Sequence, residues 1–209
     1  TLMSEHECPG LSNVYGDEFE KLYTKYENEM KHLEKIKARD LMSKIIEAQI
    51  ETGQPYMLYK DSINNKSNQK NIGVIKSSNL CAEIVEYSDK NETSVCNLAS
   101  IALPKFVKKS DKKIIYDYDG LYETAKLATK NLDEVIDINF YPTDKTERSN
   151  NKHRPIGLGI QGLADVYFKL GIAYDSEEAK EINKLIFETI YFGALEASCE
   201  LAKEKGAYE

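Results

Sequence analysis

Residues 77–87 read SSNLCAEIVEY, and the pattern in this stretch guides the interpretation of the whole chain. We predict that residues 79–83 are extended, so that successive side chains point to opposite faces. Asn79, Cys81 and Glu83 then share one face, at steps of about 6.6–6.8 Å. The residues on the other face are apolar and are expected to anchor the segment on a core: Leu80, Ala82 and Ile84. An amide, a thiol and a carboxylate would thus span a length comparable to a sugar ring.

Each of these polar residues alone carries little information. A free cysteine is most often a small buried hydrophobe, and a single Asn or Glu usually lies on the surface or in a turn. A second cysteine, Cys96, follows in residues 95–100, which read VCNLAS. The alternation of three reactive groups next to a second thiol therefore favours a functional site.

Five stretches of the chain identify a family resemblance. They are SNLCAEIVEY (78–87), VCNLASIAL (95–103), ETGQPYMLYKD (51–61), NKHRPIGLGIQGLAD (151–165) and FETIYFGALEASCELAKEKG (187–206). Together they closely resemble the large, catalytic subunit of class I ribonucleoside-diphosphate reductase. The resemblance runs from the first residue to the last, and it implies that the chain is an internal piece of a much longer subunit.

The resemblance assigns chemical roles to four residues. Cys81 matches the thiyl radical that takes the 3′-hydrogen of a ribose, and Glu83 matches the base that removes the 3′-hydroxyl proton. Asn79 matches the amide that hydrogen-bonds the substrate near those hydroxyls. Cys96 matches one half of a redox-active disulfide whose partner lies outside this chain, because neither Cys8 nor Cys199 fits the family's motif for it.

The fold class that the resemblance implies is α/β. Residues 1–209 would be a helix-rich segment of a ten-stranded α/β barrel, with a central finger loop that carries Cys81. The N-terminal ATP module, the effector loops, the loop for the substrate phosphates and the C-terminal tail would be absent. Without the resemblance, the sequence predicts only a mixed, helix-rich α/β domain. We expect apolar faces to be exposed where missing neighbours would pack.

The resemblance also implies partners and cofactors. The substrate would be a ribonucleoside diphosphate, and the reductant thioredoxin or glutaredoxin. The intact enzyme would be a homodimer of large subunits working with a small subunit that holds a diiron-tyrosyl radical. ATP or dNTP with Mg would act as allosteric effectors, and this segment would bind no cofactor itself. We therefore expect that the chain alone reduces no nucleotide.

Composition excludes several classes of protein. The chain has 209 residues, of which 41% are hydrophobic and 30% charged, and a net charge of −7, so a broad nucleic-acid surface is not expected. No apolar run reaches the roughly 18 residues of a membrane span, and the chain begins at Thr1 without a signal segment. Four scattered cysteines fit a reducing cytoplasm. His6 and Cys8 lack a second ligand pair at zinc spacing, so no metal site is predicted.

Hydrophobic periodicity predicts the following elements. Helices are expected over residues 17–29, 38–52, 117–135, 156–170 and 175–205, strands over 56–59 and 94–103, and a hairpin with strands at 106–107 and 114–116 around KKSDKK (108–113). Residues 60–73 are predicted to be a solvated polar loop, which could lie over a substrate pocket. The basic cluster at the hairpin is predicted to be a solvated turn: Lys108, Lys109, Lys112 and Lys113.

Several of these segments carry further expectations. Gly157 begins a G-x-G-x-x-G pattern, but residues 150–155 are not a strand, so a dinucleotide fold is rejected. His153 and Arg154 are expected to be structural. The helix over 175–205 is apolar nearly all round, which predicts that it is buried and that Cys199 is a core residue. In the helix over 38–52 the inward face is predicted to be Leu41, Met42, Ile45, Ile46 and Gln49.

Two alternatives remain open at this point. One is a helical interaction domain whose cysteines are only structural. The other is an anaerobic, glycyl-radical reductase of the same superfamily. The catalytic hypothesis requires Asn79, Cys81 and Glu83 to face one cavity, with Cys96 within reach of it.

Overall fold

The structure is a computed structural model that describes residues 1–111 and 113–209, apart from the side chain of Ser110. The chain forms two units, Thr1–Lys90 and Asn91–Glu209, which are described separately below. Lys112 of the predicted basic turn lies outside the described residues.

The first unit contains three α-helices, α1 (Gly16–Glu29), α2 (Ala38–Thr52) and α3 (Lys60–Lys66), and a 3-10 turn, η1 (Leu11–Asn13). The predictions of α1 and α2 are confirmed, and α2 ends as expected at Gly53, whose φ of 76° is left-handed. Two tyrosines of α1 donate hydrogen bonds to the N-terminal segment, Tyr23 to the carbonyl of Thr1 and Tyr26 to that of Pro9. The tyrosine hydroxyls of α1 therefore hold the first residues of the chain.

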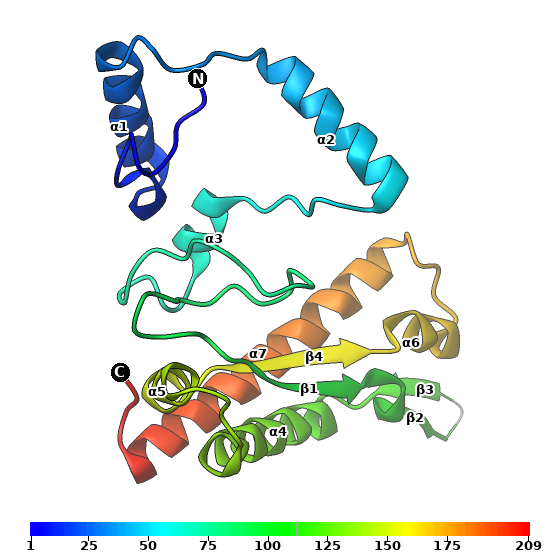
Figure 1. Cartoon of the computed structure of the whole chain (residues 1–209). Coiled ribbons are helices and arrows are strands. Elements are labelled where there is room, and N and C mark those ends of the chain that lie inside the picture. Colours follow the sequence, from blue (N-terminus) through cyan, green and yellow to red (C-terminus); the bar gives the residue numbers. More distant parts are fainter. Residues whose placement is uncertain (112) are drawn as a thin grey trace. The chain divides into compact units, whose positions relative to one another are not determined.

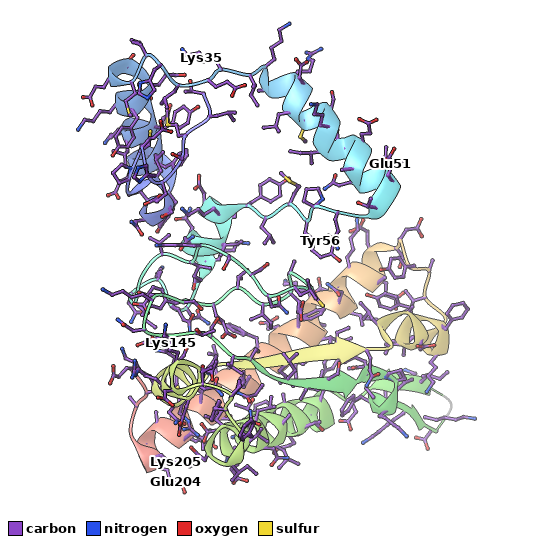
Figure 2. The ribbon with its side chains drawn as sticks, in the orientation of Figure 1. Lys35, Glu51, Tyr56, Lys145, Glu204 and Lys205 are labelled. Atoms are coloured by element: carbon purple, nitrogen blue, oxygen red, sulfur yellow. The ribbon has the colours of Figure 1, made fainter. Side chains whose placement is uncertain are left out.

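Three predictions for this unit are wrong. The expected inward face of α2 is not buried, since Leu41 is 46% and Met42 51% exposed. Residues 56–59 form no strand but the connection between α2 and α3, in which Figure 2 labels Tyr56. The expected polar loop begins instead with α3, whose Asn64 is buried. Propensity did not indicate that helix, because Asn and Ser are more common in turns and the buried contacts of Asn64 are not visible in the sequence.

The second unit is built on a parallel pair of strands, β1 (Asn97–Ala102) and β4 (Ile156–Gln161). β1 lies within the predicted strand at 94–103. After the turn η2 (Leu103–Phe106), β2 (Val107–Ser110) and β3 (Lys113–Tyr116) form the predicted antiparallel hairpin. Two sheets of two strands each are thus present among the described residues. The ten-stranded barrel remains a prediction.

Four helices complete this unit: α4 (Tyr118–Ile138), α5 (Asp144–His153), α6 (Leu163–Leu170) and α7 (Glu177–Lys205). Figure 1 shows α4 and α7 packed beside the β1–β4 pair. Their core consists of Ile101, Leu103, Leu121, Ala125, Val166, Ile186 and Ile190. The prediction of α4 is confirmed, with Asp117 as the N-cap that accepts from the Gly120 amide. α5 was not predicted.

The predicted helix over 156–170 is half wrong. Its first part is β4, and only α6 is helical. The period-two alternation of Ile156, Leu158 and Ile160 was the strand signal that the helix prediction missed. Gly162 separates the two elements with a left-handed φ of 80°. The glycines at 157 and 159 lie inside the strand rather than in a loop after it, so the rejection of a dinucleotide fingerprint holds.

α7 differs from expectation in burial. It begins two residues later than the predicted start at residue 175, with Ser176 as its N-cap, and ends at Lys205 as predicted. Only one side is covered, because Ile186 and Ile190 are buried while Tyr191 and Phe192 are more than half exposed. Cys199 is exposed, so its prediction as a core residue is wrong. Exposed apolar side chains on this unit agree with the expected open faces.

Candidate active site

Residues 79–84 form a tight turn rather than the predicted extended segment. Ala82 has a left-handed φ of 66°, and its amide donates to the carbonyl of Asn79 at 3.2 Å. The Asn79 amide donates to the carbonyl of Ile84, and the Asn79 side-chain oxygen accepts from the Ile84 amide at 3.1 Å. Asn side chains compete for backbone partners in this way, which is why a local turn replaces the extended conformation.

The turn nevertheless brings Asn79 and Glu83 into contact. The Asn79 side-chain amide donates to Glu83 Oε1 at 2.7 Å, and Cys81 lies between them in the chain with its side chain exposed. The expected apolar anchor is wrong, because Leu80 is 86% exposed. The bend of the backbone brings the side chains of Asn79 and Glu83 within hydrogen-bonding distance, whereas the sequence pattern had predicted that strand alternation would place them on one face.

This arrangement has a defined chemical capacity. The amide of Asn79 orients the Glu83 carboxylate and leaves its second oxygen available to accept a proton or a hydrogen bond. Cys81 offers an accessible sulfur in the same turn. An accessible thiol is unlike the buried, inert cysteine that the interaction-domain alternative requires.

Cys96 belongs to the second unit, where it immediately precedes β1. Its sulfur is partly buried and lies 3.9 Å from the carbonyl oxygen of Asn97. Its predicted reach to Cys81 remains a prediction. Of the other cysteines, Cys8 is buried with its sulfur 3.6 Å from that of Met30, and Cys199 is exposed on α7.

A buried polar group lies in the same unit as Cys96. His153 Nε2 lies 2.7 Å from a Glu92 carboxylate oxygen, and Lys152 donates to the other oxygen at 3.1 Å. The hydrogen bond from His153 lowers the pKa of Glu92 against the opposing effect of burial. The contact joins the end of α5 to the segment before β1.

The next residue, Arg154, ends α5 in a left-handed conformation with φ of 45°. Its guanidinium donates to the Asp133 carbonyl at 2.7 Å and to both carboxylate oxygens of Asp137 at 2.8 and 2.9 Å. Figure 2 shows Lys205 at the end of α7, and its ammonium reaches Asp133 Oδ2 at 2.8 Å. The structural roles predicted for His153 and Arg154 are confirmed.

Asn64 is a residue that sequence reasoning missed. It lay in the stretch DSINNKSNQKNIG, where Asn and Ser indicated only a loop. Its side chain hydrogen-bonds the backbone of Ile75, a few residues before the turn. Nothing in the spacing distinguished it from its exposed neighbour Asn65.

Two further features complete the description. Among the described residues, no group of three or more His, Cys, Asp and Glu side chains is arranged to hold a metal ion. No helix in the described part of the chain combines the length and the apolar character that a membrane crossing requires.

Comparison with known proteins decides the family. The model of the ribonucleotide reductase barrel domain matches residues 1–209. The chain belongs to this family. It is 56% identical over 209 residues to the ribonucleoside-diphosphate reductase large subunit of variola virus, covering 100% of this chain and 27% of that protein. It is 56% identical to the large subunit of Plasmodium falciparum, of which it covers 26%. Its identity to large chain 2 of Saccharomyces cerevisiae is 57% over 210 residues, covering 24% of that chain.

These findings confirm the family resemblance in the sequence. The chain spans about a quarter of the length of the curated relatives that it matches. Membership of the ribonucleotide reductase family covers every residue discussed above, including the Asn79–Cys81–Glu83 turn and Cys96.

Proposed function

We propose that the chain is the part of a ribonucleoside-diphosphate reductase large subunit that carries its radical cysteine. The whole subunit would convert ribonucleoside diphosphates to 2′-deoxyribonucleoside diphosphates, the precursors of DNA. The observation that carries the proposal is the turn in which Asn79 hydrogen-bonds Glu83 and Cys81 is exposed, in a chain matched throughout by the family.

Cys81 is assigned the hydrogen abstraction. The 2′-hydroxyl is hard to remove because its carbon bears no activating group, so a radical at the neighbouring 3′-carbon is formed first. A thiyl radical suits this step because the S–H bond and the activated C–H bond are of similar strength. The hydrogen can therefore move to sulfur and later return to carbon. The exposure of Cys81 supports this role, since the sulfur must reach the sugar.

Glu83 and Asn79 are assigned to the hydroxyls. The Glu83 carboxylate takes the 3′-hydroxyl proton, which helps to expel the 2′-hydroxyl as water. General base catalysis of this kind is typically worth about 10²–10⁴-fold in rate. The 2.7 Å bond from Asn79 holds the carboxylate in one orientation, and the same amide would hydrogen-bond the substrate.

Cys96 is assigned to supply the reducing equivalents with a second cysteine outside this chain. The two thiols give two electrons and two hydrogens and become a disulfide, the substrate loses one oxygen, and one water leaves. Thioredoxin or glutaredoxin then reduces the disulfide. This requirement for reduced thiols agrees with a cytoplasmic location.

The reaction would also need a small subunit and allosteric effectors. A small subunit with a diiron-tyrosyl radical supplies the oxidising equivalent that converts the Cys81 thiol to a thiyl. ATP or dNTP with Mg would regulate the large subunit, which would act as a homodimer. The iron would belong to the small subunit and not to this chain.

The proposed fold of residues 1–209 is a segment of a ten-stranded barrel whose finger loop is the turn at Cys81. β1 and β4 would be two of its strands. Their parallel pairing and the helices α4 and α7 beside them support this, because parallel sheets need cover from helices. The exposed apolar residues of α7 would pack against the rest of the subunit.

The test uses a large subunit that contains this chain, assembled with its small subunit and a dithiol reductant. Cys81→Ser is expected to abolish reduction of a ribonucleoside diphosphate while nucleotide binding is retained. Cys199→Ser is the matched control, because Cys199 is also an exposed thiol, and it is expected to keep full activity. Reduction at the wild-type rate by Cys81→Ser would overturn the proposal.

A further inference from the structure

Residues 75–78 lead into the turn that carries Cys81 and are called its first stem, and residues 85–87 leave it and are called its second stem. Asn64 of α3 holds the first stem. The Asn64 side-chain oxygen accepts from the Ile75 amide at 2.8 Å, and its amide group donates to the Ile75 carbonyl at 3.0 Å. The same amide donates to the carbonyl of Lys60 at 2.9 Å. Asn64 is 1% exposed, and Ile75 is also buried. One side chain thus pairs with the backbone of residue 75 as a neighbouring strand would.

The second stem is held from the segment that follows α3. Gln69 Oε1 accepts from the Tyr87 amide at 2.7 Å. The ring of Tyr87 packs on Gly73, where an added Cβ would lie 2.3 Å from a ring carbon. The chain therefore has room for the Tyr87 ring only because residue 73 is glycine. Both stems are thus fixed against residues 64–73.

The turn between these stems has little support of its own. Leu80, Cys81 and Glu83 are exposed, so no buried side chain at the tip fixes its position. The hydrogen bonds between Asn79 and Ile84 fix the internal shape of the turn but not where it lies. The position of the Cys81 sulfur is then set by the two stems.

We propose that Asn64 and Gln69 are positioning residues that fix the two stems of the Cys81 turn and so place its sulfur against the substrate. The inference rests on the proposed function of that turn. Neither residue touches the reacting atoms. A displacement of about 1 Å at a reacting group can cost about 10²-fold in rate, so hydrogen bonds outside the site can control the chemical step.

The chemistry of the two contacts predicts opposite responses to the same substitution. Gln69 contributes an acceptor, which a glutamate oxygen replaces at the same length. Asn64 contributes an acceptor and two donors, and aspartate supplies no donors and adds a buried charge. Gln69→Glu should therefore behave like the wild type, and Asn64→Asp like Asn64→Ala.

The experiment measures kcat, KM and the kinetic isotope effect of a 3′-deuterated ribonucleoside diphosphate in the intact large subunit with its small subunit. We expect Asn64→Ala to lower kcat about 10- to 100-fold, with a larger isotope effect because hydrogen abstraction becomes rate-limiting. Gln69→Ala should also lower kcat and raise the isotope effect, each by a smaller factor than Asn64→Ala. Gln69→Glu should keep the wild-type kcat and isotope effect. Asn65→Ala is the matched control on the exposed side of α3 and should leave both unchanged.

The isotope effect separates positioning from folding. A variant that is merely less folded has fewer active molecules, which lowers the rate without changing the isotope effect. A wild-type kcat for Asn64→Ala would overturn the inference, as would a lower kcat with an unchanged isotope effect. Cys81→Ser is assayed in parallel. If it reduces substrate, the proposed function itself fails, whereas an inactive Cys81→Ser beside an unaffected Asn64→Ala refutes only the positioning role.

Discussion

Removal of the Arg154 side chain should loosen the junction between α5, β4 and α4. Arg154 reaches one carbonyl and two carboxylates on α4, and Asp133 is only 8% exposed. Burial raises the pKa of Asp133, and the hydrogen bonds from Arg154 and Lys205 more than offset it, so the net pKa is lowered. Asp133 is therefore a buried anion that depends on two cations.

The magnitude follows from what the Arg154→Ala variant leaves behind. Breaking a buried ion pair by removing one partner typically costs about 3–5 kcal/mol. Asp133 keeps its 2.8 Å bond to Lys205, and Asp137 is half exposed and can be hydrated. We therefore expect about 2–3 kcal/mol, near the value of one or two hydrogen bonds to a charged group. Arg154→Gly should cost about 1 kcal/mol less than Arg154→Ala, because glycine adopts the left-handed backbone without strain.

Hydrogen–deuterium exchange on the intact large subunit measures the loss of stability around Arg154. A loss of about 2–3 kcal/mol corresponds to amide exchange about 30- to 140-fold faster in peptides from α5 and β4, since each 1.4 kcal/mol is tenfold. Arg154→Lys should fall between wild type and Arg154→Ala, because a lysine cannot form the paired contact with Asp137. Exchange in Arg154→Ala within twofold of wild type would refute the reasoning.

Three further predictions concern the packing of α4 against α7. Hydrogen bonds from Lys126 and Lys130 lower the pKa of Glu200 from 4.5 to about 2, so the stability it contributes is complete above pH 4.5 and is lost as the pH falls towards 2. Denaturation measured at pH 7 and at pH 3 should show a smaller difference in Lys126→Met than in the wild type, and an equal difference would contradict the assignment. Leu121→Ala removes a side chain that is 0% exposed and should cost about 2–5 kcal/mol of unfolding free energy in a urea titration, whereas a loss below about 1 kcal/mol would contradict its place in the core. Gly193→Val should also destabilise by about 1–3 kcal/mol, because even a Cβ at this position lies 3.0 Å from the Tyr122 carbonyl oxygen; an unchanged midpoint in the same titration would show that the helices can separate freely.

Elements with a strong local signal could be predicted from the sequence. The C-terminal end of α2, the N-cap of α4 and the β2–β3 hairpin all have capping or turn residues in their own sequence. Elements set by distant contacts could not be predicted. β4 needs its parallel partner β1, which lies more than fifty residues earlier, and Gly157 and Gly159 weaken its local strand signal. The predictions of burial failed most clearly at α2 and α7, because an apolar helix surface is buried only where a partner covers it.

In the candidate site, too, the sequence predicted some features and missed others. The identity of Asn79, Cys81 and Glu83 as a group came from their spacing and the family resemblance. Their geometry could not be predicted in the same way. The side-chain oxygen of Asn79 accepts from the Ile84 amide and closes a turn, whereas the alternating pattern predicted an extended segment. Asn64 was missed because a buried asparagine that pairs with a backbone is indistinguishable in sequence from a solvated one.

The most direct test of the account separates hydrogen abstraction from net reduction. In the intact large subunit with its small subunit, loss of tritium from a 3′-tritiated ribonucleoside diphosphate would be measured for Cys81→Ser and Cys96→Ser. No tritium loss is expected with Cys81→Ser, whereas Cys96→Ser should still release tritium but complete no clean turnover to deoxynucleotide. Tritium release by Cys81→Ser at the rate of Cys96→Ser would contradict the assignment of the radical to the Cys81 sulfur.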